Sequence, residues 1–254
     1  MSSRALKVLA ACAMLADHIG YVFMTQFTPE WYIFRGFGRI AFPIFCYLIC
    51  RGYEHTSSLP KYMGRLLLFA GISEIPYDLC FSKTAYNPDK CNVFVTLLLG
   101  LISVTAAGTG AKYVMEKLKA PEKLRENVFM QTLCALPVIA GCMWTAKTLH
   151  SDYGWAGVAI IYIIFLFRKN EAAALTALGI ANCLLLCIDI TPAKGFFGVW
   201  TFNFMRTIQW FAPLACLPLG FYNGKKGSEK LKRFFYVFYP THLMVLWLVW
   251  KVFI

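Results

Sequence analysis

The segment LKVLAACAMLADHIGYVFMTQ, residues 6–26, is long and apolar enough to cross a bilayer as one helix. Near its middle lie Asp17 and His18, two ionisable residues at a depth where charge is costly. A membrane helix carries such residues when they face a protein interior or water. The pair therefore predicts a functional site, and it indicates an enzyme or a carrier rather than a scaffold.

The rest of the chain shares the apolar character of this segment. Hydrophobic residues make up 59% of the 254 residues and charged residues 15%, whereas soluble domains carry about 25% charged residues. We therefore expect an all-α polytopic membrane bundle of about nine helices, forming a single domain over residues 1–254. The expected spans are 6–26, 31–50, 62–82, 92–109, 128–149, 153–167, 171–190, 200–222 and 233–254.

The cations are distributed unequally between the two sides of this expected bundle. Of the lysines and arginines, 17 lie at the N-terminus and in alternate links, and 5 lie in the opposite links. Basic links stay in the cytoplasm, so we expect a cytoplasmic N-terminus and an outer C-terminus in a bacterial inner membrane. The net charge of +12 is thus explained by topology, and a nucleic-acid partner is not expected.

One link is long and amphipathic. Residues 108–127 predict a pair of helices broken at Pro121, with lysines lying at the anionic lipids of the inner leaflet.

The ten cysteines form neither a CxxC pair nor a cluster with histidines at zinc spacing. We interpret them mainly as small buried hydrophobic residues and expect no metal site. Cys80 and Cys91 flank an outer loop, and a disulfide between them is left open.

Asp17 and His18 are adjacent, so on a helix their side chains point about 100° apart. The carboxylate therefore does not orient the neighbouring imidazole, and each side chain needs a partner from another helix. Arg35 and Arg39 are four residues apart and share one helix face, where two like charges require anions opposite. We expect the Asp17 carboxylate to form an ion pair with an arginine.

Glu74 and Asp78 form a second pair at a spacing of four residues, on one face of the third expected span. Acidic and basic faces on neighbouring helices predict a buried ion-pair network that includes Asp17.

A second histidine, His242, lies in the last expected span. At 1.5 Å per residue it sits roughly 14 Å from the cytoplasmic end, and His18 sits roughly 18 Å in. Both imidazoles are then near the midplane of a hydrocarbon core about 30 Å thick. Each imidazole either makes a structural hydrogen bond between helices or transfers protons. Asp152, at the start of the sixth span, is either a helix cap or a site residue.

The order of several short motifs resembles that of the TraX family of membrane acetyltransferases, known for acetylating the N-terminus of conjugative pilin. The shared stretches are Leu6-Lys7, Asp17-His18, Gly38 to Pro43, Lys61-Tyr62, Arg65-Leu66, Ser73 to Pro76, Asn92-Val93, Ser151 to Gly154, Tyr222 to Gly224 with Gly227, and Phe238 to Leu243. Through this family the chain is similar to the broader transmembrane acyltransferases.

The resemblance implies transfer of acetyl from cytoplasmic acetyl-CoA to an amine or hydroxyl of a peptide, glycan or lipid acceptor. The implied catalytic set is Asp17, His18, Arg39, Glu74, Asp78, Asp152 and His242, with a histidine as general base and Arg39 facing the oxyanion. The implied coenzyme-binding set is Lys61, Arg65, Asn223, Lys225, Lys226 and Tyr239. A proton-coupled transporter using the same buried acids and histidines is the alternative, and a structural role in envelope assembly is a third possibility.

Overall fold

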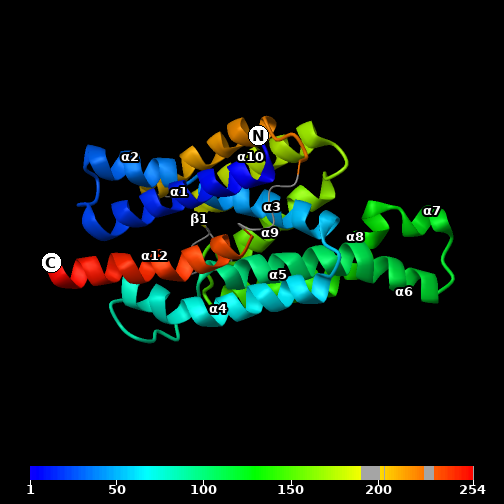
Figure 1. Ribbon diagram of the computed structural model, residues 1–254. Coiled ribbons are helices and arrows are strands. Elements are labelled where there is room, and N and C mark those ends of the chain that lie inside the picture. The colour runs from blue at the N-terminus through cyan, green and yellow to red at the C-terminus, as the bar shows by residue number, and fades with distance from the viewer. Residues whose placement is uncertain (190–200, 203, 226–231, 254) are drawn as a thin grey trace. The chain divides into compact units, whose positions relative to one another are not determined.

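The computed structural model describes residues 1–189, 201–202, 204–225 and 232–253, and these are almost entirely helical, as expected (Figure 1). The helices before the middle link are α1 (Ser3–Phe23), α2 (Pro29–Gly38), α3 (Ala41–His55), α4 (Leu59–Phe81) and α5 (Val93–Thr105). Those that follow are η1 (Ala106–Gly110), α6 (Ala111–Lys117), α7 (Glu122–Arg125), α8 (Val128–Thr148), α9 (Gly154–Leu166), α10 (Glu171–Cys187), η2 (Phe204–Ala215), α11 (Cys216–Gly220) and α12 (Lys232–Phe253). Two two-residue strands, β1 (Ile188–Asp189) and β2 (Thr201–Phe202), pair antiparallel.

Five helical segments of the described chain are long and apolar enough to cross a membrane. They are Ser3–Phe23, Pro29–His55, Val93–Lys117, Val128–Thr148 and Phe234–Phe253. Three shorter apolar helices, Gly154–Leu166, Glu171–Leu186 and Ile208–Gly220, fall within three further expected spans. The membrane class is confirmed, while the count of nine spans remains a prediction.

Helix starts follow the local sequence. Thr28 precedes Pro29, and its hydroxyl accepts a hydrogen bond from the backbone N–H of Trp31 at 3.3 Å, which caps α2. Asn92 caps α5 and Asn127 caps α8 in the same way. These side chains satisfy N–H groups that a helix leaves unpaired in its first turn.

The second expected span is divided into two helices. Helix α2 ends at Gly38 and α3 begins at Ala41, so the helix is interrupted at Arg39 and Ile40. Pro43 lies in the first turn of α3, where a missing N–H costs little. The break gives Arg39 a position at the junction of two helices rather than in the middle of one.

The amphipathic link forms the expected pair of helices. Helix α5 continues through the π-helix η1 into α6, and α7 begins directly after Pro121. An ion pair of 2.6 Å between Lys112 and Glu126 connects the two ends of this link.

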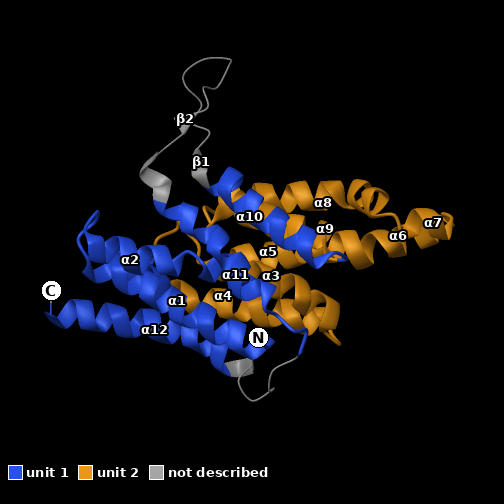
Figure 2. Ribbon diagram, turned by 90° about the horizontal axis from the view of Figure 1, so that it is seen from above, with its two compact units in different colours: residues 1–45, 75–86, 169–254 blue, residues 46–74, 87–168 orange. Residues whose placement is uncertain are grey.

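The chain divides into two compact units, each built from separated stretches of sequence (Figure 2). Unit 1 comprises residues 1–45, 75–86 and 169–254, and unit 2 comprises residues 46–74 and 87–168. Helices α3 and α4 therefore contribute residues to both units.

Each unit has its own tight helix contacts. In unit 1, Gly20 of α1 lies so close to α2 that a Cβ there would be 2.9 Å from Cβ of Phe34. In unit 2, Gly100 of α5 lies directly against Ile161 of α9. Small residues let membrane helices approach closely, which replaces the hydrophobic driving force available in water.

Candidate functional site

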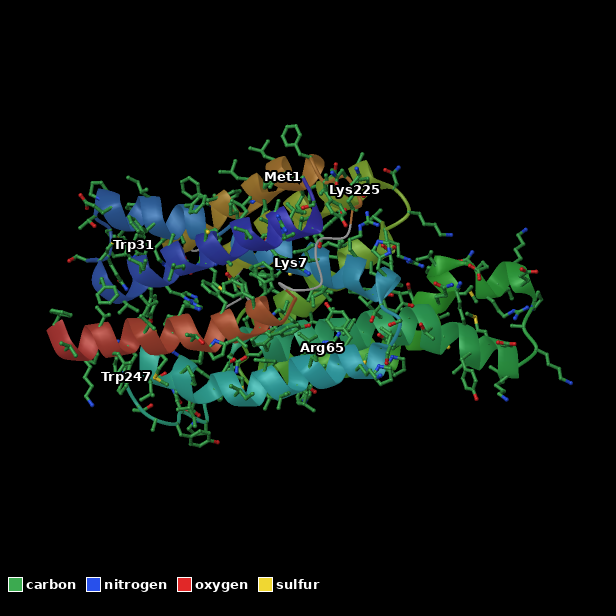
Figure 3. All side chains as sticks on the ribbon, in the orientation of Figure 1. Met1, Lys7, Trp31, Arg65, Lys225 and Trp247 are labelled. Atoms are coloured by element: carbon green, nitrogen blue, oxygen red, sulfur yellow. The ribbon has the colours of Figure 1, made fainter. Side chains whose placement is uncertain are left out.

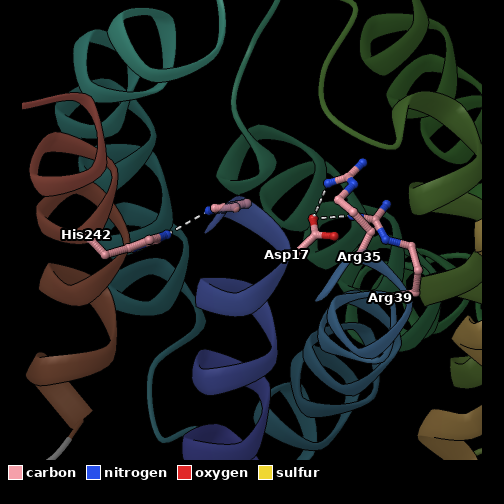
Figure 4. Close-up of polar contacts among 5 residues, drawn as sticks. Asp17, Arg35, Arg39 and His242 are labelled. Carbon is pink, nitrogen blue, oxygen red and sulfur yellow. Dashed lines mark hydrogen bonds and ion pairs between the residues drawn. The ribbon is translucent and has the colours of Figure 1, made fainter. Parts of the chain in front are cut away.

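Unit 1 brings together two histidines that are 224 residues apart in sequence. Nδ1 of His18 on α1 lies 2.8 Å from Nε2 of His242 on α12, and the two rings are almost parallel, with 9° between their planes (Figure 4). His242 is buried and His18 is partly buried. The expectation that both imidazoles lie at one depth is consistent with this direct contact.

The hydrogen bonds of His242 define the tautomers of the neutral pair. Nδ1 of His242 lies 2.8 Å from the backbone carbonyl of Phe238, which only accepts, so Nδ1 carries the proton. In a neutral ring Nε2 of His242 is then an acceptor, and Nδ1 of His18 is the donor to it. Nε2 of His18 therefore carries a lone pair, and it has no hydrogen-bond partner among the described residues.

Aromatic rings surround the two imidazoles within unit 1. Phe81 meets the ring of His18 edge-on at a centroid distance of 5.0 Å, and Tyr239 meets both histidines edge-on. Phe238 stacks on His242 at 4.8 Å. This environment is poor in polar groups, so it favours neutral imidazoles and strengthens any hydrogen bond that forms inside it.

Asp17 projects from the other side of α1 toward two arginines (Figure 4). Its Oδ2 accepts a 2.8 Å hydrogen bond from Nη1 of Arg35 and a second one from Nη2 of Arg39. All three side chains are largely buried, with 9% of the Asp17 side chain, 15% of Arg35 and 8% of Arg39 exposed. The expected pairing of Asp17 with an arginine is confirmed for both arginines.

Gly38 explains how α2 comes so close to this carboxylate. A Cβ at Gly38 would lie 2.7 Å from Cα of Asp17 and 2.6 Å from its Oδ1. A side chain at this position would separate the helices, so the absence of a Cβ keeps Asp17 within reach of the arginines.

The acidic pair of α4 divides between the two units. Asp78 is fully buried in unit 1. Glu74 belongs to unit 2, where its Oε2 accepts hydrogen bonds from the side-chain and backbone N–H groups of Asn92. Asn92 is itself fully buried and also donates to the carbonyl of Ala70 at 2.7 Å. Glu74 thus fixes the start of α5 against α4.

Asp152 is not the cap of α9, so that interpretation is wrong. The N-cap position is Tyr153, which has a left-handed backbone with φ of 64° and makes no side-chain capping bond. The backbone of Asp152 is held by Cys91 and Thr96, through a 2.8 Å bond to the Cys91 carbonyl and a bond from the Thr96 hydroxyl. A site role for Asp152 stays a prediction within unit 2.

The expected coenzyme-binding residues also fall in both units. Lys61 and Arg65 lie in unit 2, where the Arg65 guanidinium is 5.6 Å from the ring centroid of Tyr62. Asn223 and Lys225 lie in a turn of unit 1, where the Asn223 side chain accepts a 3.2 Å bond from the backbone N–H of Lys225. Lys226 lies outside the described residues.

The turn that holds Asn223 is joined to the start of the chain. The backbone carbonyl of Lys225 accepts from Ser3, and that of Met1 accepts from Asn223, at 3.1 and 2.9 Å. Met1 and Lys225 lie near each other in Figure 3. The Asn223 side chain therefore has a structural use in shaping this turn.

Sequence reasoning missed two groups that shape these clusters. The carbonyl of Phe238 orients His242, and no side-chain pattern marks a backbone acceptor. Asn92 was visible only as part of a shared motif, although its place before the apolar run of α5 is typical of an N-cap. No disulfide joins Cys80 and Cys91 in the structure.

These features define a polytopic helical membrane protein in which α1 contributes one residue to a buried ion-pair cluster and the next residue to an imidazole pair. The chain belongs to the TraX family, because the family described as TraX protein matches residues 2–250. This confirms the resemblance drawn from the motifs.

Two relatives are similar over much of the chain. The probable fimbrial assembly protein FimC, serogroup H1, of Dichelobacter nodosus is 26% identical over 250 residues, which cover 95% of this chain and 92% of the relative. An uncharacterised protein of Rickettsia prowazekii (strain Madrid E) is 26% identical over 167 residues, or 65% of this chain and 56% of that protein. No solved structure matches.

Proposed function

We propose that this protein is a membrane acetyltransferase that moves acetyl from acetyl-CoA to an amine or hydroxyl of an acceptor. The observation that carries the proposal is the direct contact of the two imidazoles, because in the neutral pair these hydrogen bonds leave the lone pair of His18 Nε2 available as a base. Membership of the TraX family supports the same reaction class.

In the proposed reaction the acceptor nitrogen or oxygen attacks the thioester carbonyl carbon of acetyl-CoA. His18 Nε2 removes the acceptor proton as the new bond forms, and the carbonyl oxygen becomes an oxyanion. The carbon–sulfur bond then breaks, the coenzyme A thiolate leaves, and His18 returns the proton to that sulfur. The products are the acetylated acceptor and free coenzyme A, with both histidines neutral again.

His242 acts as the positioning residue in this scheme. Its Nε2 accepts from Nδ1 of His18, which fixes the tautomer and the ring orientation of the base, as the third member of a catalytic triad does. When His18 takes a proton, the same hydrogen bond stabilises the cation that forms.

The remaining roles follow from charge. Arg39 would stabilise the oxyanion with N–H groups beyond the one that it donates to Asp17. Lys61 and Arg65 of unit 2 would hold coenzyme phosphates, and a role for Lys225 and Lys226 stays a separate prediction. The proposal includes nine spans in the bacterial inner membrane with the N-terminus in the cytoplasm, and a peptide, glycan or lipid acceptor.

The test is transfer of labelled acetyl from acetyl-CoA to acceptors in a membrane extract by the purified protein. We expect His18→Ala to lower kcat by roughly 10²–10⁴-fold, the usual contribution of a general base. His55→Ala is the matched control, since His55 is an exposed histidine at the end of α3, and it should transfer at the native rate. Absence of transfer by the native protein would exclude the enzyme and favour a proton-coupled transporter.

A second pair of variants separates the base from its positioning residue. His242→Ala removes the acceptor for His18 Nδ1, so kcat should fall less than in His18→Ala and the pH profile of kcat should change. His242→Gln supplies a carbonyl acceptor and should restore part of the rate. If both variants keep the native pH profile and rate, His242 does not position the base.

A further inference from the structure

One end of unit 2, where α3 ends and α4 begins, contains arginines next to aromatic rings. On one side, Gly52 of α3 packs against Tyr62 of α4 so closely that a Cβ at Gly52 would lie 2.8 Å from the tyrosine hydroxyl. The Arg65 guanidinium lies over the Tyr62 ring, 5.6 Å from its centroid. Figure 3 labels Arg65 on α4. Arg65 is therefore held against α3 through a tyrosine.

The other side of α3 carries a similar arrangement. The hydroxyl of Tyr53 is 2.9 Å from that of Thr109 in the π-helix η1, and its ring meets Phe165 edge-on at 5.6 Å. The guanidinium of Arg168 lies 3.8 Å from the Phe165 ring centroid and donates to the Phe165 carbonyl at 2.9 Å. A series of contacts thus leads from Arg65 through Tyr62 to α3, and from α3 through Phe165 to Arg168.

The arginines of this region differ in how their charge is balanced. Arg51 forms a 2.8 Å ion pair with Glu54 and donates to the Tyr47 hydroxyl. Arg65 and Arg168 are partly buried, and neither has a carboxylate within ion-pair distance among the described residues. Nε of Arg65 is buried, and no hydrogen-bond partner for it is found among the residues that the structure describes.

A partly buried guanidinium without an acid is costly unless an anion from outside the chain completes it. Aromatic rings hold guanidinium planes in place, which prepares them for bidentate binding of phosphate oxygens. The π-helix adds a second indication, because single π-turns inside helices are frequent at functional sites.

We propose that Arg65 and Arg168 bind a ligand that carries two phosphate groups, one for each guanidinium. Two sources provide this chemistry. Coenzyme A carries a diphosphate and a separate phosphate, and that source rests on the proposed acetyltransferase function. A lipid with two phosphates, such as cardiolipin, is the other source, since basic pockets between membrane helices bind such headgroups.

The experiment measures binding of two probes to the purified full chain. Free coenzyme A is titrated into the protein in detergent by calorimetry, and cardiolipin is offered in nanodiscs and detected by native mass spectrometry. Phosphatidylglycerol, with one phosphate, is the lipid control. The variants are Arg65→Gln and Arg168→Gln, and Lys90→Gln is the matched control because Lys90 is an exposed cation of the same unit.

We expect the dissociation constant of one probe to rise at least tenfold in each arginine variant and to stay unchanged in Lys90→Gln. Arg168→Lys keeps the charge without the planar fork and should give an intermediate value, which a misfolded protein would not. Loss of coenzyme A binding identifies the acyl donor as the ligand, and loss of cardiolipin identifies a lipid.

Two results would overturn the proposal: neither probe binds the native chain, or both bind all variants equally. The His18→Ala variant separates this site from the acetyltransferase reaction. If that variant loses transfer while the arginine variants bind both coenzyme A and cardiolipin as the native chain does, the enzyme stands and the phosphate site is wrong.

Discussion

Adjacent residues of α1 solve the problem of a polar group in a membrane in two different ways. Asp17 forms ion pairs with two arginines, whereas His18 makes a hydrogen bond to a second imidazole. The side of α1 that carries Asp17, here the charged face, is packed so closely against α2 that position 38 has to be a glycine. The side that carries His18, here the neutral face, is lined by aromatic rings. The difference predicts that removal of Asp17 mainly lowers stability and that removal of His18 mainly lowers the rate of the proposed acetyl transfer.

The largest effect on stability should come from removing the carboxylate. Asp17→Ala leaves two buried arginines without their anion, and breaking such a pair costs about 3–5 kcal/mol. Unfolding of the purified protein in mixed micelles measures this free energy. A loss below 1 kcal/mol would show that the charged face does not hold α1 and α2 together.

Arg35→Leu is the matched variant, because it leaves one carboxylate with one arginine, Arg39. It removes the excess positive charge, so its cost in unfolding free energy should be well below that of Asp17→Ala. Equal losses in the two variants would mean that packing, not charge balance, determines the effect.

A smaller effect should follow from adding one methyl group at the helix contact. Gly38→Ala places a Cβ against Asp17, and overpacking of this kind typically costs about 1–3 kcal/mol. Gly71→Ala is the control, since a Cβ there meets no atom within 4 Å, and it should be neutral or slightly stabilising. The same unfolding assay compares the two glycines.

The smallest effect should appear on the neutral face. Phe81→Leu removes the edge-on contact with His18, which is worth about 0.5–1.5 kcal/mol for an aromatic pair. We expect a larger change in the rate of acetyl transfer than in stability, because His18, the proposed base, loses the aromatic ring that packs against it. A stability loss as large as that of Asp17→Ala would remove the distinction between the two faces.

Much of the charged face could be predicted from sequence, because its residues lie on two helices that follow one another in the chain. The spacing of Arg35 and Arg39 put both cations on one helix face, and the cost of burying them required an anion. Adjacent helices joined by a short loop then made Asp17 a natural partner.

The contacts of the neutral face could not be predicted in the same detail. Depth counting placed His18 and His242 at one level, but sequence does not state which helices are neighbours in a bundle. The break at Arg39 was also missed, since two glycines and a proline inside an apolar run do not specify where a helix ends. Asn92, as the partner of Glu74, depends on a contact between helices that periodicity does not encode.

The π-helix η1 has a consequence for how the chain tolerates changes in length. A π-turn accommodates one extra residue in an α-helix, and each residue of an α-helix turns the chain by about 100°. Deleting one residue from 106–110 would therefore restore regular winding and leave α6 facing nearly its present direction, whereas deleting one residue from the regular helix α5 would rotate α6 by about 100° about its axis. The deletion in α5 would turn Lys112 away from Glu126, so the π-turn is the place where this helix tolerates a change in length.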